Sequence, residues 1–306
     1  MKIVIWSFQV AVFYLCTLVF SLLPASLVRP TGNYIGKLGA FIISKRRRIA
    51  VENIRMALPA MMEHPDWNFS SHTPEEIAHM MFRHLGISFV ETCRLYHGRG
   101  KEILERIEVR GWEHLEAAKA RGKGVILLTG HCGNWELAAL SIPRHFSCTM
   151  SVVAKRQSNP YLNSMVEKIR LNYGNQIIYK NNAIKNMLTV FRKNGLVGLL
   201  VDQAVFPTDG ALIDFLGRKA WASKAPVLVA RRSGTAVVPA FIHREADRHI
   251  IEIHPELVFF DDTSEQGIAA DVKKYSCVIE KFIVRHPVDW YWVHRRWKQA
   301  GELVGE

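Results

Sequence analysis

The first stretch of the chain is almost wholly apolar. Residues 3–28 contain no charged side chain, and Gln9 is the only strongly polar one within the 21 residues 3–23. A helix of that length extends about 30 Å, the thickness of the hydrocarbon core of a bilayer. The pattern predicts a retained membrane anchor in residues 1–28. A cleaved signal peptide and a buried core helix are the alternatives, although the run is longer than a usual signal-peptide core.

The next predicted segment, residues 29–58, is basic. Within residues 29–55, seven Lys and Arg oppose one Glu, a net charge of +6. Only Lys2 precedes the apolar stretch, so the positive-inside rule places the body of the protein in the cytoplasm. The basic run 45–48 is either a solvated face or a contact for anionic lipid head groups, where each basic residue contributes about 1 kcal/mol.

Glycines at positions 32, 36 and 39 separate apolar residues after Pro30, which predicts a second short helix over residues 31–44 at the membrane surface. Residues 60–72 have the composition of a loop. The sequence Thr73-Pro74-Glu75-Glu76 is typical of a helix start, and that helix is expected to run to about Tyr96.

The remaining chain, part of a body predicted over residues 59–306, alternates between short apolar runs and helical patterns. The runs predict strands at 125–129, 150–154, 176–179, 196–201, 236–242 and 250–253. The helical patterns lie near 113–120, 135–142, 160–172, 182–193, 223–233 and 264–285. This alternation predicts an α/β fold with a mostly parallel sheet flanked by helices, whose functional site lies beyond the carboxyl ends of the strands.

Composition restricts the class of protein further. The chain has 306 residues, 49% apolar and 22% charged, with a net charge of +12. It is too apolar for a disordered protein and too charged for a polytopic membrane protein. Its five cysteines are odd in number and form no CxxC pair, so neither a disulfide framework nor a structural zinc site is indicated.

One loop after the strand at 125–129 carries candidate chemistry. It reads Gly130-His131-Cys132-Gly133-Asn134-Trp135-Glu136 and precedes an apolar helical pattern. On one continuous helix His131 and Glu136 would diverge by about 140°. If Asn134 caps the helix, Glu136 falls in its first turn, and Gly130 and Gly133 let the loop fold His131 back toward it. Glu136 could then orient the imidazole of a general base, and helix amides could favour developing negative charge.

Other chemistries remain open but have less support. Metal binding would need further ligands at set spacing, and the HExxH pattern is absent. A hydrolase is not indicated, because no GxSxG occurs and Cys132 has no independent support as a nucleophile. A structural loop histidine with a capping acid is the alternative to a proton-transfer pair of His131 and Glu136.

Five ordered motifs of this chain resemble the late (lauroyl and myristoyl) acyltransferases of lipid A biosynthesis, within the lysophospholipid acyltransferase superfamily. They are HCGNWE, Asn159-Pro160 with Arg170, Val201-Asp202-Gln203, Asp214-Phe215-Leu216-Gly217 and Trp292-Val293-His294-Arg295-Arg296-Trp297-Lys298. The resemblance covers nearly the whole chain. An HxxxxE pattern alone would be a weak signal, whereas five motifs in order are a strong one.

The resemblance implies an enzyme of the bacterial inner membrane, with a single-pass N-terminal anchor and a catalytic domain on the cytoplasmic face. It would transfer a fatty acyl chain from a thioester of acyl carrier protein, or of coenzyme A, to a hydroxyl of a phosphorylated lipid. His131 would deprotonate that hydroxyl and Glu136 would hold the imidazole, without cofactor, metal or covalent acyl-enzyme.

Substrate binding or oxyanion stabilisation is assigned by the same resemblance to nine further residues: Asn134, Gly133, Lys155, Arg156, Arg170, Asp202, Gln203, Gly217 and Arg296. Lys155 stands where many members have Arg, and Ser223 where the family often has Thr. The first difference places a two-pronged phosphate contact at Lys155 in doubt.

Some of these residues also have structural interpretations. Asp202 and Gln203 could simply form a strand-end turn, and Arg170 could pair with Glu167 on its own helix. The aromatic and basic run 290–298 is expected to contact the membrane interface or an acceptor phosphate, with a plain packed tail as the alternative. Nucleic-acid binding is not expected, since no stacking module accompanies the run. Alternative functions are acyl transfer from coenzyme A to a lysophospholipid or other glycolipid, and a non-catalytic membrane-tethered binder of anionic lipid.

Overall fold

The computed structural model describes residues 2–260 and 262–301, so the end of the body predicted over residues 59–306 lies partly outside the described residues. Four helices come first along the chain: α1 (Lys2–Ser21), α2 (Ala25–Ile42), α3 (Ser44–Met62) and α4 (Pro74–Tyr96). The expected apolar helix is present as α1, and it is long and apolar enough to cross a membrane. The helix start at Thr73 is confirmed as well, because Thr73 and Glu76 form a reciprocal capping box.

The second helix begins earlier than predicted. α2 starts at Ala25 and continues through Pro30, so the expectation of a start after this proline is wrong. Pro30 lies inside α2, where it removes one backbone hydrogen bond, and the helix tolerates this loss. The glycines have a packing role: a Cβ at Gly86 of α4 would lie 2.1 Å from the carbonyl oxygen of Gly32 in α2. Glycine at both positions lets the two backbones touch.

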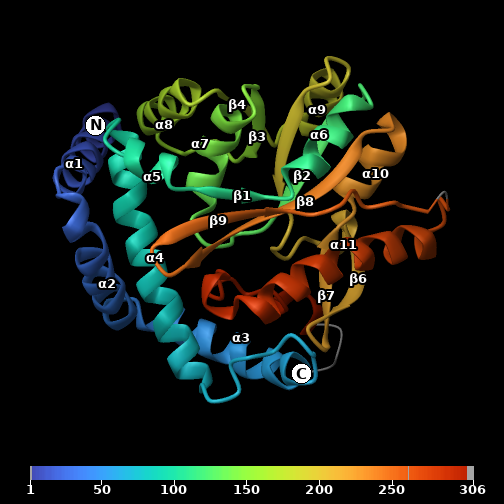
Figure 1. Ribbon diagram of the computed structural model, residues 1–306, viewed down its shortest axis with the longest axis horizontal. Coiled ribbons are helices and arrows are strands. Elements are labelled where there is room, and N and C mark those ends of the chain that lie inside the picture. The colour runs from blue at the N-terminus through green and yellow to red at the C-terminus, as the bar shows by residue number, and fades with distance from the viewer. Residues whose placement is uncertain (1, 261, 302–306) are drawn as a thin grey trace.

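The main sheet has seven strands in the order β1-β9-β8-β2-β5-β3-β4 (Figure 1). Its strands are β1 (Glu108–Arg110), β2 (Val125–Thr129), β3 (Met150–Ala154), β4 (Asn175–Tyr179), β5 (Leu196–Leu200), β8 (Ala236–Glu245) and β9 (Arg248–Ile253). All six predicted strands are present, and every pair is parallel except β8 with β9. The α/β prediction is therefore confirmed.

Three strands were not predicted. β1 adds an edge to the main sheet, and β6 (Gly210–Phe215) pairs with β7 (Arg218–Ser223) as a separate antiparallel hairpin. The helix expected over 223–233 begins only at α10 (Ala225–Ser233), because Ser223 is the last residue of β7.

Helices cover both faces of the main sheet, as the predicted parallel topology requires. The other helices are α5 (Lys101–Glu105), α6 (Trp112–Ala120), α7 (Trp135–His145), α8 (Pro160–Asn172), α9 (Ala183–Phe191), α11 (Glu265–Arg285), α12 (Lys298–Gly301) and the short turns η1 (Pro207–Asp209) and η2 (Pro287–Asp289). Along β2, Val125 and Leu127 join one core with α6 and α7. Ile126 and Leu128 join the other core with α9, α10 and α11.

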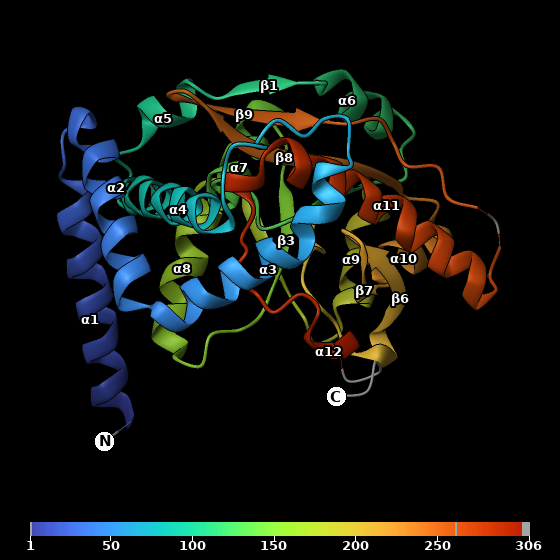
Figure 2. The ribbon, with the colours of Figure 1, turned by 90° about the horizontal axis from the view of Figure 1, so that it is seen from below.

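Helix α1 lies along the body of the protein, beside α4 and α8 (Figure 2). The asparagine before α8, Asn159, donates from Nδ2 to the carbonyl oxygen of Trp6 and to Oε1 of Gln9, both at 3.0 Å. Near the other end of the helix, Oγ1 of Thr17 lies 2.9 Å from Nε2 of His97. Most other side chains of α1 point outward, so one face of this apolar helix is left exposed.

Candidate active site

The two central strands β2 and β5 place His131 beside Asp202. Thr129 pairs with Leu200 at the end of these parallel strands, so the loops that follow leave the sheet at the same edge. Nδ1 of His131 lies 2.8 Å from Oδ1 of Asp202, and the backbone N–H of His131 donates to Oδ2 at 2.9 Å. The prediction of a site beyond the carboxyl ends of the strands thus agrees with the positions of these two residues.

Asp202 is held as a buried carboxylate. Its exposed fraction is 2%, and Nε1 of Trp290 donates a further hydrogen bond to Oδ2 at 2.9 Å. Burial by itself would raise the pKa of Asp202, but the hydrogen bonds and charge of His131, together with the indole N–H, hold that pKa below its ordinary value. An ionised Asp202 holds Nδ1 and leaves Nε2 as the nitrogen for proton transfer. The side-chain amide nitrogen of Gln203, a predicted site residue, lies 3.3 Å from this Nε2.

A segment near the C-terminus supports this pair. The backbone N–H of Tyr291 donates to the carbonyl oxygen of His131 at 3.0 Å, and that of Gly133 donates to the carbonyl of Asp289 at 2.6 Å. Gly133 has a φ of +48°, and a Cβ there would lie 2.5 Å from the carbonyl oxygen of Ile242. Gly133 therefore has a backbone role in the loop, and the assigned contact with substrate is not supported.

Glu136 does not orient His131, which corrects the expected pairing. Its carboxylate accepts two hydrogen bonds from Arg170, through Nε and Nη2 at 3.0 Å each, and one from the hydroxyl of Tyr96 at 3.1 Å. Within residues 2–260 and 262–301, no hydrogen bond joins Glu136 to His131. The position of Glu136 in the first turn of α7 turns its side chain toward α4 and α8, away from the histidine loop.

The ion pair of Glu136 and Arg170 is partly buried. Burial alone would lower the pKa of Arg170, but the charge and hydrogen bonds of Glu136 outweigh it, and this pKa is raised. Burial and the neighbouring Glu136 raise the pKa of Tyr96, so its hydroxyl stays protonated and donates. The alternative pairing of Arg170 with Glu167 is not found among the described residues. Glu167 instead accepts a hydrogen bond from the hydroxyl of Tyr179.

Asn134 is the expected helix cap. Its Oδ1 accepts from the backbone N–H of Leu137 at 3.0 Å, while its Nδ2 donates to Glu91 at 3.0 Å. Only 2% of Asn134 is exposed, so the side chain shapes the turn and does not reach substrate. Glu91 is itself buried and also binds Arg244 and His249. This hydrogen-bond network holds Asn134, and with it the start of α7, in place.

A cleft of about 500 Å³ opens beside His131. The predicted residues on its lining are His131, Glu136, Lys155, Arg170 and Gln203. Lys155 follows the end of β3, and Lys180, which was not predicted, follows the end of β4. The other lining residues are mostly apolar, among them Ala139, Val152, Ile184, Met187, Leu199 and Pro226. Positive charge and an apolar wall thus meet in one cleft.

A small pocket of about 40 Å³ adjoins the cleft beneath α7. Trp135, Ala139, Val152 and Leu200 line both spaces. The ring of Trp135 also lies 5.3 Å from the imidazole of His131, measured between ring centroids. The apolar wall of the cleft therefore continues into the core close to the histidine.

Three residues assigned to substrate lie elsewhere. Arg296 is 1% exposed, donates to the carbonyl of Trp221 and stacks 4.7 Å from the ring of Phe215, so it supports the β6–β7 hairpin. Gly217 forms the turn of that hairpin with a φ of +76°. Arg156 lies over the ring of Tyr179 at 4.6 Å and is not part of the cleft lining.

Sequence reasoning missed Tyr96 and Trp290 because each acts from a distant part of the chain. Tyr96 belongs to the last turn of α4, and Trp290 begins the run 290–298, which was expected at the membrane interface or at an acceptor phosphate. This expectation is wrong for the buried residues of the run, among them Trp290, Trp292, Arg296 and Trp297. Cys132, considered as a nucleophile, is fully buried, and burial raises the pKa of its thiol well above the usual range.

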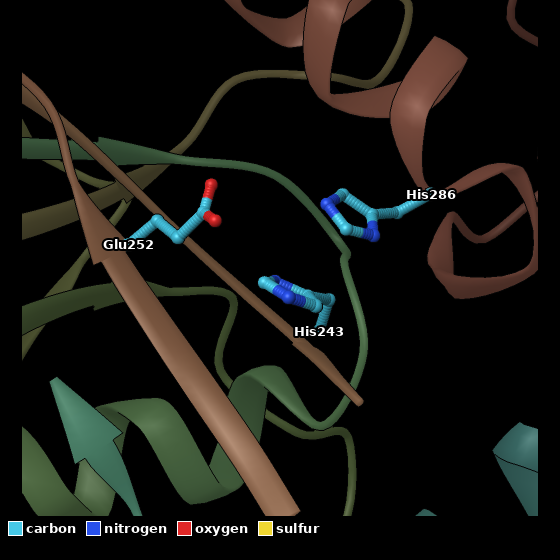
Figure 3. A group of neighbouring side chains, drawn as sticks. All are labelled: His243, Glu252 and His286. Atoms are coloured by element: carbon cyan, nitrogen blue, oxygen red, sulfur yellow. The ribbon is translucent and has the colours of Figure 1, made fainter. Parts of the chain in front are cut away.

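Away from the cleft, His243, Glu252 and His286 bring possible metal ligands within 4.8 Å of one another (Figure 3). The two imidazole rings stack, 3.8 Å apart and inclined by 23°. A metal lies in the plane of an imidazole that binds it, and planes this nearly parallel do not meet at a nearby ion. This trio is therefore a packing contact.

Comparison with known proteins assigns the family. The model of the family described as "Bacterial lipid A biosynthesis acyltransferase" matches residues 2–299 of this chain. The lipid A biosynthesis acyltransferase of Haemophilus influenzae is 26% identical over 299 residues, which cover 94% of this chain and 86% of that protein. The phosphatidylinositol mannoside acyltransferase of Mycobacterium tuberculosis is 25% identical over 66% of this chain and 63% of its own length.

Among solved structures, the 1-acyl-sn-glycerophosphate acyltransferase PlsC of Thermotoga maritima matches with a TM-score of 0.36 and 14% identity, covering 76% of this chain and 98% of that chain. This likeness is too low to add to the assignment, which depends on the family match over nearly the whole sequence. The chain belongs to the bacterial lipid A biosynthesis acyltransferases.

Proposed function

We propose that this enzyme transfers a fatty acyl chain from a thioester to a hydroxyl group of a lipid A precursor. The observation that carries the proposal is His131, held through Nδ1 by the buried carboxylate of Asp202 at the edge of a cleft with an apolar wall. The family match supports acyl transfer, and the name of the Haemophilus relative supports lipid A biosynthesis as its setting.

In the proposed mechanism Nε2 of His131 takes the proton of the acceptor hydroxyl as its oxygen attacks the thioester carbonyl. The tetrahedral intermediate collapses by breaking the carbon–sulfur bond, and the imidazolium returns the proton to the leaving thiolate. Products are the ester and the free thiol, without a covalent acyl-enzyme. Asp202 stabilises the transient imidazolium, the role first expected of Glu136.

The cations of the cleft would stabilise negative charge. Arg170 is fixed by Glu136, and Lys155 projects from the end of β3 into the same space. We propose that they stabilise the oxyanion of the intermediate or bind phosphate of a substrate. Lys155 offers a point charge and not a planar fork, so its contact with phosphate would be single-pronged.

The acyl chain would lie against the apolar wall formed by Ala139, Val152 and Leu200. That wall adjoins the small cavity under α7, which would receive the end of the chain. Acyl carrier protein is the proposed donor, with coenzyme A as the alternative. The acceptor hydroxyl approaches Nε2 of His131.

We further propose attachment to the cytoplasmic face of the bacterial inner membrane. Phe8 of α1 and Phe41 of α2 are 69% and 77% exposed, so these two helices present apolar surface to lipid. The basic start of α3 follows directly, which supports contact with anionic head groups. A purely transmembrane α1 would have to leave its contacts with Asn159 and His97 or take these residues into the bilayer, so α1 is proposed to enter lipid while docked.

The test uses membranes that contain wild-type enzyme or the His131→Ala variant, supplied with labelled acyl carrier protein and a lipid A precursor. Transfer by the wild type and none by the variant is expected. Equal transfer by both would exclude His131 as the base. A wild-type enzyme that transfers to no lipid would favour the membrane-tethered binder.

The mycobacterial relative, whose name specifies a phosphatidylinositol mannoside, supports another glycolipid as the second candidate acceptor. Mass spectrometry of lipid A from a deletion strain separates the two candidates. Loss of one acyl chain, with its mass, would identify the lipid A hydroxyl and chain length, whereas an unchanged lipid A profile would favour the glycolipid.

A further inference from the structure

The apolar helix α1 is joined to the body through partly buried polar contacts as well as apolar packing. Nδ2 of Asn159 donates to two acceptors of α1, the carbonyl of Trp6 and Oε1 of Gln9. Asn159 is only 6% exposed, and Thr17, the partner of His97, is 5% exposed. Gln9, the strongly polar residue of this helix, is itself exposed, but its amide oxygen accepts from Asn159 of the body.

Asn159 connects this docking contact to the cleft through α8. While Nδ2 holds α1, Oδ1 of the same side chain accepts from the backbone N–H groups of Tyr161 and Leu162 and caps α8. Arg170 lies in the last turn of α8 and binds Glu136 with two hydrogen bonds. A helix of this length is about 20 Å long and moves nearly as a rigid body, so displacement of its first turn displaces Arg170.

A second connection reaches the same carboxylate through α4. His97, which contacts Thr17 of α1, directly follows Tyr96, and the hydroxyl of Tyr96 donates to Glu136. Both elements that hold Glu136 are therefore in contact with α1.

We propose that α1 positions the active site as well as attaching the enzyme to lipid, and that Asn159 is the positioning residue through which docking of α1 sets the Arg170–Glu136 pair. This inference is based on the proposed function of the cleft and adds to it a coupling between the membrane-facing helix and the rate of acyl transfer. It also gives a physical role to the Asn159-Pro160 motif, which the mechanism does not use.

Asn159→Asp separates the two roles of this side chain. Aspartate caps a helix as well as asparagine does, so α8 keeps its start. It cannot donate, however, and it places a carboxylate against two acceptors of α1. We expect kcat to fall about fivefold or more, while KM for the acyl donor, the thermal midpoint and the membrane-bound fraction stay close to wild type.

Gln9→Leu tests the same contact from the other helix. Because this substitution makes α1 more apolar, a loss of activity could not be caused by weaker binding of α1 to lipid. The variant should lower kcat in the same direction by a smaller factor. Ser7→Leu is the matched control, because Ser7 is exposed on the same helix. It should leave kcat unchanged.

A double-mutant cycle with Arg170→Ala identifies the route. If docking acts through Arg170, Asn159→Asp lowers kcat in the wild-type background and has no further effect in Arg170→Ala. Additive losses would show a general structural role and overturn the inference. If Asn159→Asp and Gln9→Leu both kept the wild-type kcat while Arg170→Ala was slow, the inference about α1 would be overturned and the proposed role of the Arg170–Glu136 pair would stand. Wild-type kcat in Arg170→Ala would instead contradict the proposed role of the pair.

Discussion

Nδ1 of His131 and Oδ1 of Asp202 are 2.8 Å apart, although the two residues are separated by 71 positions in the chain. This contact forms because β2 and β5 are adjacent and parallel, and because both loops leave the sheet at the same edge. The carboxylate nearer in sequence, Glu136, is bound by Arg170 and Tyr96 instead. The proposed dyad of His131 and Asp202 is thus brought together by the topology of the sheet.

Replacement of Asp202 by Asn should abolish most activity. An amide at this position stabilises neither the correct tautomer of His131 nor its cation, so kcat should fall by about 10²- to 10⁴-fold. Steady-state kinetics with a labelled acyl donor measure the loss, and circular dichroism checks the fold. Glu136→Gln serves as the comparison: if it were the more damaging variant, and Asp202→Asn nearly active, the assignment of Asp202 would be wrong.

Trp290→Phe removes the indole donor but keeps an aromatic ring in the core. A hydrogen bond to a charged group contributes about 1.5–3 kcal/mol, which corresponds to at most about a tenfold to hundredfold loss of kcat. The variant should be slower than wild type and faster than Asp202→Asn. Kinetics equal to wild type would show that the bond from Nε1 to Asp202 has no part in catalysis.

Glu91→Gln should destabilise the fold at neutral pH by about 3–5 kcal/mol, because it leaves Arg244 buried without its counter-charge. Burial alone would raise the pKa of Glu91, but His249 and Arg244 hold it well below the ordinary 4.5. A lowered pKa stabilises the native state above pH 4.5, and this contribution is lost as the pH falls below it.

Chemical unfolding of wild type and Glu91→Gln between pH 3 and 8 measures this dependence. The difference in unfolding free energy should be largest near pH 7 and should narrow below about pH 4.5. A difference that is constant across this range would contradict the charged state assigned to Glu91.

Gly86→Leu should separate α4 from α2. A Cβ at this position already meets the carbonyl oxygen of Gly32 at 2.1 Å, and a larger side chain cannot be accommodated without moving a backbone. We expect a lower thermal midpoint and faster proteolysis within residues 22–43. Gly39→Leu is the control, since a Cβ at Gly39 meets no atom within 4 Å, and it should be tolerated.

The double variant Phe41→Asp, Ile42→Asp should reduce membrane attachment. These side chains are 77% and 67% exposed at the end of α2, and replacing them with carboxylates opposes both apolar burial and attraction to anionic lipid. Flotation with vesicles that contain anionic phospholipid measures the bound fraction. Val258→Asp, at a residue 75% exposed on a distant loop, should bind like wild type. Equal loss in both would exclude a specific role for α2.

Local patterns of the sequence predicted most elements correctly. The strands at 125–129 and 150–154 and the helix after Thr73-Pro74 follow from apolar runs and capping residues that act over a few positions. The hairpin of β6 and β7 was missed because its strands are stabilised by α11 and by buried Arg296, and neither influence is visible in a local window.

The site shows the same division. By itself, the sequence determined that His131 follows a central strand, that Asn134 caps the next helix and that the chain has an apolar first helix, since each property depends on neighbouring residues. The tertiary structure decided which carboxylate orients His131, that Glu136 binds Arg170, that Arg296 is buried away from the cleft and that Asn159 joins α1 to α8. These contacts depend on which strands and helices become neighbours in space, and that order comes from packing the whole sheet.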